Sequence, residues 1–212
     1  MENPTRRRVL AAGLTGTALG LIGGRVVSAG TTPPSDPPPG TALEANEPTS
    51  SEPPQRPTAA DIELLGFAQS VELTAQDLYQ VALDAGAEDD VITLLRDNHQ
   101  AYAQVIASIL GVDARDRRDE ELYLELAPSF EETGIRVLAA NGYDLESALV
   151  ATHTVLVGSL EGIDGARVIA SIITVEAQQS TVLADMAGNG EDLDVLFVND
   201  AEALPVPSGS GG

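Results

Sequence analysis

Between residues 59 and 188, apolar side chains recur at spacings of three and four, the period of helices that each bury one face. The sequence predicts four such helices, over residues 59–85, 91–111, 144–159 and 164–188. Very short connections join the first to the second and the third to the fourth, so each pair must form an antiparallel hairpin. The connection between the two hairpins is long enough to cross the bundle. The pattern therefore predicts an all-α four-helix bundle with a long connection between its second and third helices.

Two local signals support the predicted helix starts. Thr58 and Asp61 have the residue types and the spacing of a capping box, in which each side chain accepts a hydrogen bond from the other residue's amide. The third helix is expected to begin at Asp144, because a carboxylate is a favourable N-cap.

The first 29 residues are typical of a removable export signal of the twin-arginine type. Arg6 and Arg7 precede a short apolar run without charges, and a small-residue cleavage site ends at Ala29. The apolar run is too short and too rich in glycine to remain as a membrane anchor after cleavage. We therefore expect a protein that meets the twin-arginine translocase during export. It would then reside in the periplasm, in the cell envelope or outside the cell.

The rest of the chain divides into three predicted parts. Residues 30–58 hold nine of the thirteen prolines and little that can be buried, which predicts a disordered linker. Residues 59–200 contain the four helices and form the predicted domain. Residues 201–212 are expected to be a flexible tail.

The composition excludes several classes of function. The chain has 33 acidic and 11 basic residues, for a formal net charge of −22, so binding to nucleic acid phosphates or anionic lipid is not expected. It has no cysteine, which excludes disulfides, iron–sulfur clusters and thiolate chemistry. No combination of nucleophile and base typical of an enzyme appears, so no catalytic residues are assigned. The composition leaves the ligand and the formation of a homo-oligomer open.

Several polar side chains fall on the apolar stripes of the helices. They are Glu72 on the first helix, His99 on the second, and Glu176 and Gln179 on the fourth. A buried carboxylate is costly unless it is paired, so each of these groups needs a partner. Carboxylate and imidazole ligands suit iron or manganese.

The segments around two of these carboxylates resemble a known family. Segments 67–73 and 173–179, around Glu72 and Glu176, are similar to those of exported ferritin-like domain proteins with twin-arginine leaders, and the resemblance covers roughly residues 59–200. It implies a ferritin-like bundle that holds two metal ions with six side chains. In that pattern, two helices each supply one Glu and the other two each supply a Glu-x-x-His pair.

The chain departs from this pattern at three of the six positions. Arg96 stands where the second helix should have Glu, and Gln179 stands where the fourth should have His. Thr152 occupies the place of the third helix's Glu; His153 next to it is expected at the bundle edge or in water. The candidate metal ligands that remain are Glu72, His99 and Glu176, so the resemblance implies a degenerate dinuclear site.

The cation at position 96 suggests another way to satisfy the buried carboxylates. The Arg96 guanidinium could lie between Glu72 and Glu176 and replace the charge of the metal, since its planar fork binds carboxylates in a bidentate manner. Gln179 and Thr152 would then supply neutral hydrogen bonds.

Three functions are therefore open at this stage. The first is a non-catalytic binding or structural module of the cell envelope, with a degenerate metal site and no cofactor. The second is a ferritin-like metalloprotein that binds iron or manganese and handles oxidants or iron. The third is an acidic surface protein that stores cations without a defined site.

Overall fold

The computed structural model of the chain describes residues 54–207, all of which belong to one compact unit, Thr49–Gly212. The predicted leader, residues 30–53 of the predicted linker and residues 208–212 of the predicted tail lie outside the described residues.

All regular secondary structure in the described part of the chain is helical, with no strand, which confirms the all-α prediction. Its elements are α2 (Ala59–Asp84), α3 (Asp90–Leu110), the short 3₁₀ turn η1 (Gly111–Asp113), α4 (Glu120–Phe130), α5 (Ile135–Ser159), α6 (Ile163–Ala187) and α7 (Leu193–Phe197).

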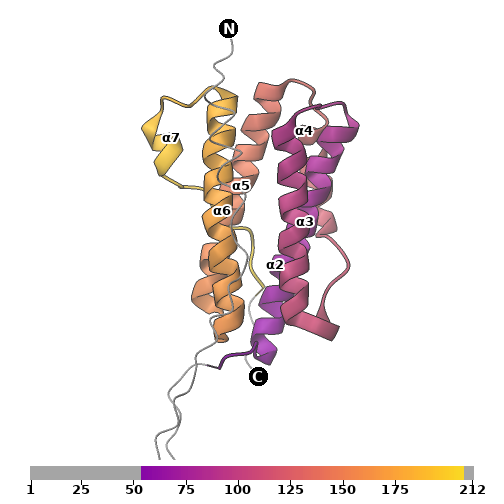
Figure 1. The fold of residues 1–212 in the computed structure, drawn as a ribbon, viewed down its shortest axis with the longest axis vertical. Helices are drawn as coiled ribbons and strands as arrows, with labels where there is room; N and C mark the ends of the chain where they lie inside the picture. The colour runs from indigo at the N-terminus through magenta and orange to yellow at the C-terminus, as the bar shows by residue number, and fades with distance from the viewer. Residues whose placement is uncertain (1–53, 208–212) are drawn as a thin grey trace, which may run out of the picture. The chain divides into compact units, whose positions relative to one another are not determined.

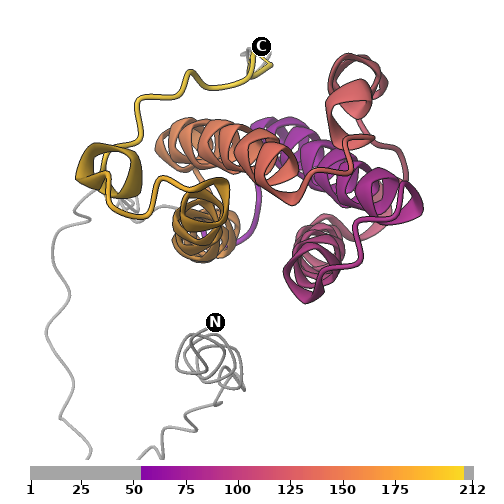
Figure 2. The same ribbon diagram turned by 90° about the horizontal axis from the view of Figure 1, so that it is seen from above.

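Four long helices, α2, α3, α5 and α6, lie side by side along a common axis (Figure 1). The view from above separates them into two packed hairpins, α2 with α3 and α5 with α6 (Figure 2). The short helix α4 packs against the outside of α2, and α7 packs against α6. The short connections therefore give the hairpins that the sequence predicts, and the core forms between their facing stripes.

The start of α5 differs from the prediction. The helix begins at Ile135, so Asp144 lies within it and is not its N-cap. The polar stretch around Asn141 and Gly142 resembles a helix stop, but tertiary packing overrides this local signal. A Cβ atom added at Gly142 would lie 3.2 Å from the Leu183 side chain and from the Tyr79 hydroxyl. Gly142 thus allows α5 to pack closely against α2 and α6.

The predicted capping box at the start of α2 is confirmed. The Thr58 amide donates to Asp61 Oδ2 at 2.8 Å, and the Asp61 amide donates to Thr58 Oγ1 at 3.3 Å. The buried Asp61 carboxylate also accepts the amides of Glu161 and Gly162, at 2.8 and 2.9 Å, in the turn between α5 and α6. One carboxylate therefore fixes the start of α2 to the α5–α6 turn.

The segment before α2 also contacts this turn. The carbonyl oxygens of Pro54 and Gln55 accept the amides of Ile163 and Asp164 at the start of α6, at 2.9 and 3.0 Å. These amides belong to the first turn of a helix and have no partner within it. The last residues of the predicted linker are thus hydrogen-bonded to the domain.

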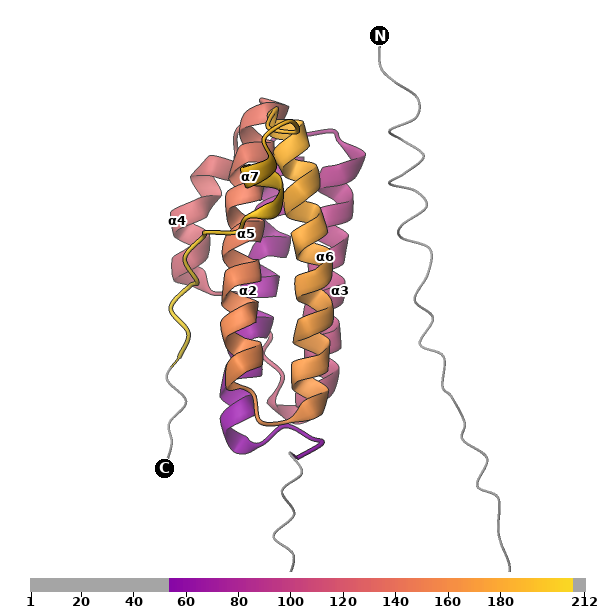
Figure 3. The same ribbon diagram turned by 90° about the vertical axis from the view of Figure 1, so that its left-hand side faces the viewer.

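The chain after α6 lies along the outside of α5 (Figure 3). Tyr143 Oη donates to the Val195 carbonyl at 3.1 Å, and Asn199 Nδ2 donates to the Ser147 carbonyl at 2.9 Å. Leu204 packs against the core, and its amide donates to Thr152 Oγ1 at 2.9 Å. Part of the segment predicted to be a flexible tail is therefore held on α5. Within residues 54–207, no helix combines the length and the apolar character that crossing a membrane requires.

The Asp61 contacts lead to a stability prediction. We expect Asp61→Ala to lower the free energy of unfolding by about 2–4 kcal/mol, because three backbone amides lose a charged acceptor at one end of the bundle. Urea unfolding followed by circular dichroism at 222 nm measures this change. Glu63→Ala removes an exposed carboxylate from the same helix and should alter stability by less than about 0.5 kcal/mol. Equal effects of the two substitutions would contradict the role assigned to Asp61.

Candidate metal centre

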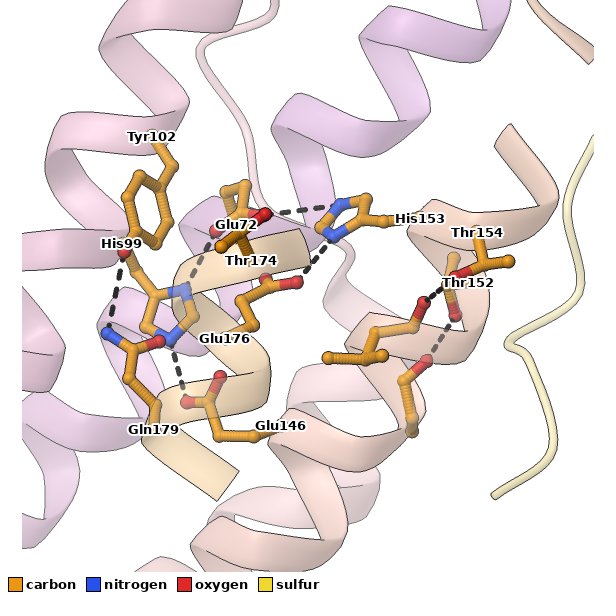
Figure 4. Close-up of polar contacts among 12 residues, drawn as sticks. Glu72, His99, Tyr102, Glu146, Thr152, His153, Thr154, Thr174, Glu176 and Gln179 are labelled. Carbon is orange, nitrogen blue, oxygen red and sulfur yellow. Dashed lines mark hydrogen bonds and ion pairs between the residues drawn. The ribbon is translucent and has the colours of Figure 1, made fainter. Parts of the chain in front are cut away.

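Five ionisable side chains meet inside the bundle, and each of them has an exposed fraction of zero. We call them the carboxylate–histidine cluster: Glu72 from α2, His99 from α3, Glu146 and His153 from α5, and Glu176 from α6 (Figure 4).

The helices bring these groups together by simple spacing. Glu146 and His153 are seven residues apart on α5, which is two helical turns, so their side chains project from the same face. Glu72 lies between Ala68 and Ala75, both fully buried, on the inner face of α2. These small neighbours leave room beside the carboxylate for the side chains of the facing helices.

His99 lies between two carboxylates. Its Nδ1 is 2.7 Å from Glu72 Oε2, and its Nε2 is 2.9 Å from Glu146 Oε1. Tyr79 stacks on the imidazole, with ring centroids 5.6 Å apart and planes inclined by 13°. The Tyr79 hydroxyl donates to Glu146 Oε1 at 2.7 Å. Burial and the neighbouring Glu146 raise the pKa of Tyr79 well above 10, so this hydroxyl keeps its proton.

His153 also lies between two carboxylates, but with a different geometry. Its Nδ1 is 2.9 Å from Glu176 Oε2 in a hydrogen bond. Its Nε2 is 3.2 Å from Glu72 Oε1, yet neither of these two atoms has a hydrogen-bond partner among the described residues. Glu72 is therefore shared by both histidines. The cluster alternates carboxylate and imidazole from Glu146 through His99, Glu72 and His153 to Glu176.

Burial and mutual attraction shift the protonation of these groups in predictable directions. Burial opposes a charge on His99, but Glu146 and Glu72 outweigh it and hold the pKa of His99 well above 6.5. For His153 too, burial lowers the pKa, but Glu176 and Glu72 more than offset this and raise it above 6.5. Burial, opposed by His153 and assisted by the charges of Glu72 and Glu146, raises the pKa of Glu176 to about 7. The cluster therefore retains protons near neutral pH.

Three of the five groups have the geometry of a metal site. Glu72, His153 and Glu176 each offer one ligand atom, and these atoms lie within 4.8 Å of one another. Within the described chain, Glu72 Oε1, His153 Nε2 and Glu176 Oε1 are also buried atoms without a hydrogen-bond partner. Buried polar atoms normally have hydrogen-bond partners, so these three atoms without one fit a bound cation. Carboxylate oxygens and an imidazole nitrogen are donors that iron and manganese accept.

The residues predicted from sequence are only part of this arrangement. Glu72, His99 and Glu176 all belong to the cluster, but His99 lies outside the trio that converges. His153, which we expected at the bundle edge or in water, is fully buried at the centre. Glu146 was not among the residues predicted from sequence. The signal that could have found Glu146 and His153 is their seven-residue spacing on one helix.

The proposal that Arg96 replaces a metal charge is wrong. Arg96 Nη1 donates to Gln80 Oε1 at 2.9 Å, its Nε donates to Asp97 Oδ1 at 2.8 Å, and its side chain is 28% exposed. The physical reason is that the histidines already occupy the positions between the buried carboxylates. The long Arg96 side chain therefore reaches toward solvent, where its charge is hydrated.

Thr152 and Gln179 do not bind the carboxylates of the cluster either. Thr152 Oγ1 donates to the Ala148 carbonyl at 2.6 Å and accepts the Leu204 amide. Gln179 Nε2 donates to Tyr102 Oη at 3.5 Å. Thr152 thus fixes the chain after α7 to α5, whereas Gln179 lies beside the cluster (Figure 4).

The raised pKa of His99 gives a pH-dependent prediction for the metal-free protein. The stability that His99 contributes is fully present below its unfolded pKa of about 6.5 and is lost as the pH rises through its higher folded pKa. We therefore expect the stability advantage of the wild type over His99→Gln to shrink between pH 6 and pH 9. Urea unfolding with a metal chelator present measures it at each pH. An advantage that stays constant or grows with pH would contradict the proposed pairing.

Comparisons of this chain with protein-family models, with curated proteins and with solved structures found no match. The ferritin-like resemblance consequently remains an expectation from sequence.

Proposed function

We propose that this protein binds one iron or manganese ion through Glu72, His153 and Glu176, inside a four-helix bundle of the ferritin-like kind. The observation that carries the proposal is the convergence of three ligand atoms within 4.8 Å, on residues that also hold buried atoms without hydrogen-bond partners. Such a site would supply a redox-active ion for the handling of oxidants or iron. This proposal corresponds to the second of the three functions that the sequence leaves open, the metalloprotein.

The choice of metal follows from the ligands. Two carboxylates and one imidazole are hard or intermediate donors, and the chain has no cysteine thiolate to favour softer ions. The donor set alone does not select against zinc or copper, which bind most nitrogen and oxygen sites more tightly than manganese or ferrous iron. The proposed iron or manganese therefore depends on which ion is supplied when the protein folds. Folding before export, as the predicted twin-arginine leader implies, would place that step inside the cell.

One ion is proposed because the two histidines are placed differently. Glu72 and Glu146 contact opposite nitrogens of the His99 ring, so the ring separates them. A second ion at this position would require His99 to give up one of these hydrogen bonds. His99, Glu146 and Tyr79 instead form a chain of contacts that ends on Glu72 Oε2 and orients this carboxylate. Supporting contacts of this kind commonly position the ligands of metal sites.

A second candidate function follows from the same contacts. Because each imidazole lies between two carboxylates, the cluster is paired internally without an ion. Buried ionic networks can serve structural specificity alone. If the cluster has only this structural role, the protein is a non-catalytic binding or structural module of the cell envelope, the first function that the sequence leaves open.

Metal binding to the purified full-length chain separates the two candidates. After reconstitution with Fe²⁺ or Mn²⁺ without oxygen and removal of free metal, we expect one equivalent per chain by plasma mass spectrometry. His153→Gln and Glu176→Gln should each weaken binding by more than about 100-fold, because each removes a ligand. Glu146→Gln should keep one equivalent with a loss of about 10–100-fold, because it only supports a ligand.

Glu125→Gln is the matched control, since it removes one exposed carboxylate from α4 and should leave binding unchanged. A folded wild type that retains no metal would favour the structural module instead. Two equivalents would contradict the role given to His99. Binding that none of the three site variants weakens would point to loose storage by the acidic surface.

A further inference from the structure

The carboxylate–histidine cluster is closed to solvent, so an ion needs a route to reach it. All five side chains have an exposed fraction of zero. Beside the cluster, Tyr102 is half-buried and Gln179 is 7% exposed. The Tyr102 ring meets the His99 ring edge-on, with centroids 5.7 Å apart and planes inclined by 84°. On this side, the ring packed against His99 is thus itself partly exposed to solvent.

Tyr102 and Gln179 come from different hairpins. Tyr102 is on α3 and Gln179 is on α6, so their contact closes the seam between these two helices (Figure 4). The contact is one hydrogen bond of 3.5 Å, at the outer limit for such a bond. This closure is therefore weak compared with the packing within each hairpin.

The opposite side of the bundle carries additional segments. The helix α4 packs on α2, and the chain after α7 follows α5 with Leu204 packed against the core. The helix α7 covers part of α6. In the view from above, no further described segment covers the seam between α3 and α6 (Figure 2). Side chains alone close the bundle there.

Gln179 carries a second feature that points to a ligand. Its Oε1 is buried and has no hydrogen-bond partner in residues 54–207. Gln179 follows Glu176 by three residues on the same face of α6, and Glu176 Oε1 is also without a partner. The Gln179 amide oxygen thus lies on the side of the seam, and the Glu176 carboxylate, which belongs to the trio of ligands, comes next along the same helix face. Oxygen atoms of both kinds bind divalent cations.

From these observations we infer that Tyr102 and Gln179 form the access port of the metal centre, and that Gln179 Oε1 is the first protein ligand of the incoming divalent cation. This inference rests on the proposed function. Displacement of the Tyr102 ring breaks its bond with Gln179 and opens the seam. Gln179 Oε1 would then replace a water of an incoming cation, and Glu176, the trio member on the same face of α6, would bind it next. Return of the Tyr102 ring would close the seam again.

The rate of metal uptake by the full-length chain tests the port. Co²⁺ serves as the probe because its visible absorption changes when nitrogen and oxygen ligands replace water. Stopped-flow mixing with a fixed excess of Co²⁺ gives the rate, and the final absorption gives the amount bound. Tyr102→Ala should accelerate uptake about tenfold or more by removing the ring, and Gln179→Leu should slow it by a similar factor by removing the oxygen. Both variants should bind the same final amount as the wild type.

Tyr143→Ala is the matched control, since it removes a half-buried tyrosine from the side of the bundle covered by α7. It should change the rate by less than about twofold. Tyr102→Phe keeps the ring in the core and loses only the hydroxyl, so it should fold even where Tyr102→Ala does not, and it should take up Co²⁺ faster than the wild type.

The amount bound and the rate separate the two proposals. Normal final binding with unchanged rates in the Tyr102 and Gln179 variants overturns the port and leaves the metal centre standing. An equal acceleration by Tyr143→Ala also overturns it, because the route would then not be specific. A wild type that binds no Co²⁺, Fe²⁺ or Mn²⁺ overturns the metal centre, and the port with it.

Discussion

Three carboxylates share the core of this bundle, and two imidazoles placed between them allow this. Glu146, Glu72 and Glu176 would repel one another in a medium that screens charge poorly. His99 and His153 separate them and pair with them at distances of 2.7–3.2 Å. All four long helices contribute to this chain of contacts, so the register of every helix depends on it. Gly142 and the small residues beside Glu72 provide the space that the arrangement needs.

The two imidazoles differ in their surroundings and in their tasks. His99 is held on both edges and stacked against Tyr79, so it works as a fixed spacer that orients Glu72. His153 turns Nε2 toward Glu72 Oε1 without forming a hydrogen bond. Glu176 Oε1 also has no hydrogen-bond partner among the described residues. A site built for two ions would treat the histidines alike. The asymmetry is what limits the proposed centre to one ion, and it also leaves Gln179 available at the edge of the cluster.

The sequence predicted the parts of this structure that depend on short-range order. Helical periodicity, short turns and the Thr58–Asp61 capping box act over a few residues. They predicted the existence and order of the four long helices, and the start of α2, correctly. The start of α5 was wrong because its packing through Gly142 depends on Tyr79 and Leu183, which are distant in sequence. Glu146 was missed and His153 was placed outside because the buried face of α5 is wider than one apolar stripe and includes both residues. Arg96 was misplaced because a pattern of residue types does not show that a histidine from another helix already occupies the same space.

The most direct test of this account is the position of the metal in a crystal of the full-length protein grown with Mn²⁺. Anomalous diffraction identifies manganese independently of the ligands around it. The account predicts one anomalous peak per chain, bonded to Glu72, His153 and Glu176, with His99 still between Glu72 and Glu146. Two peaks, or one peak between Glu72 and Glu146 with His99 displaced, would contradict it. So would a cluster without a peak at a Mn²⁺ concentration that saturates binding in solution.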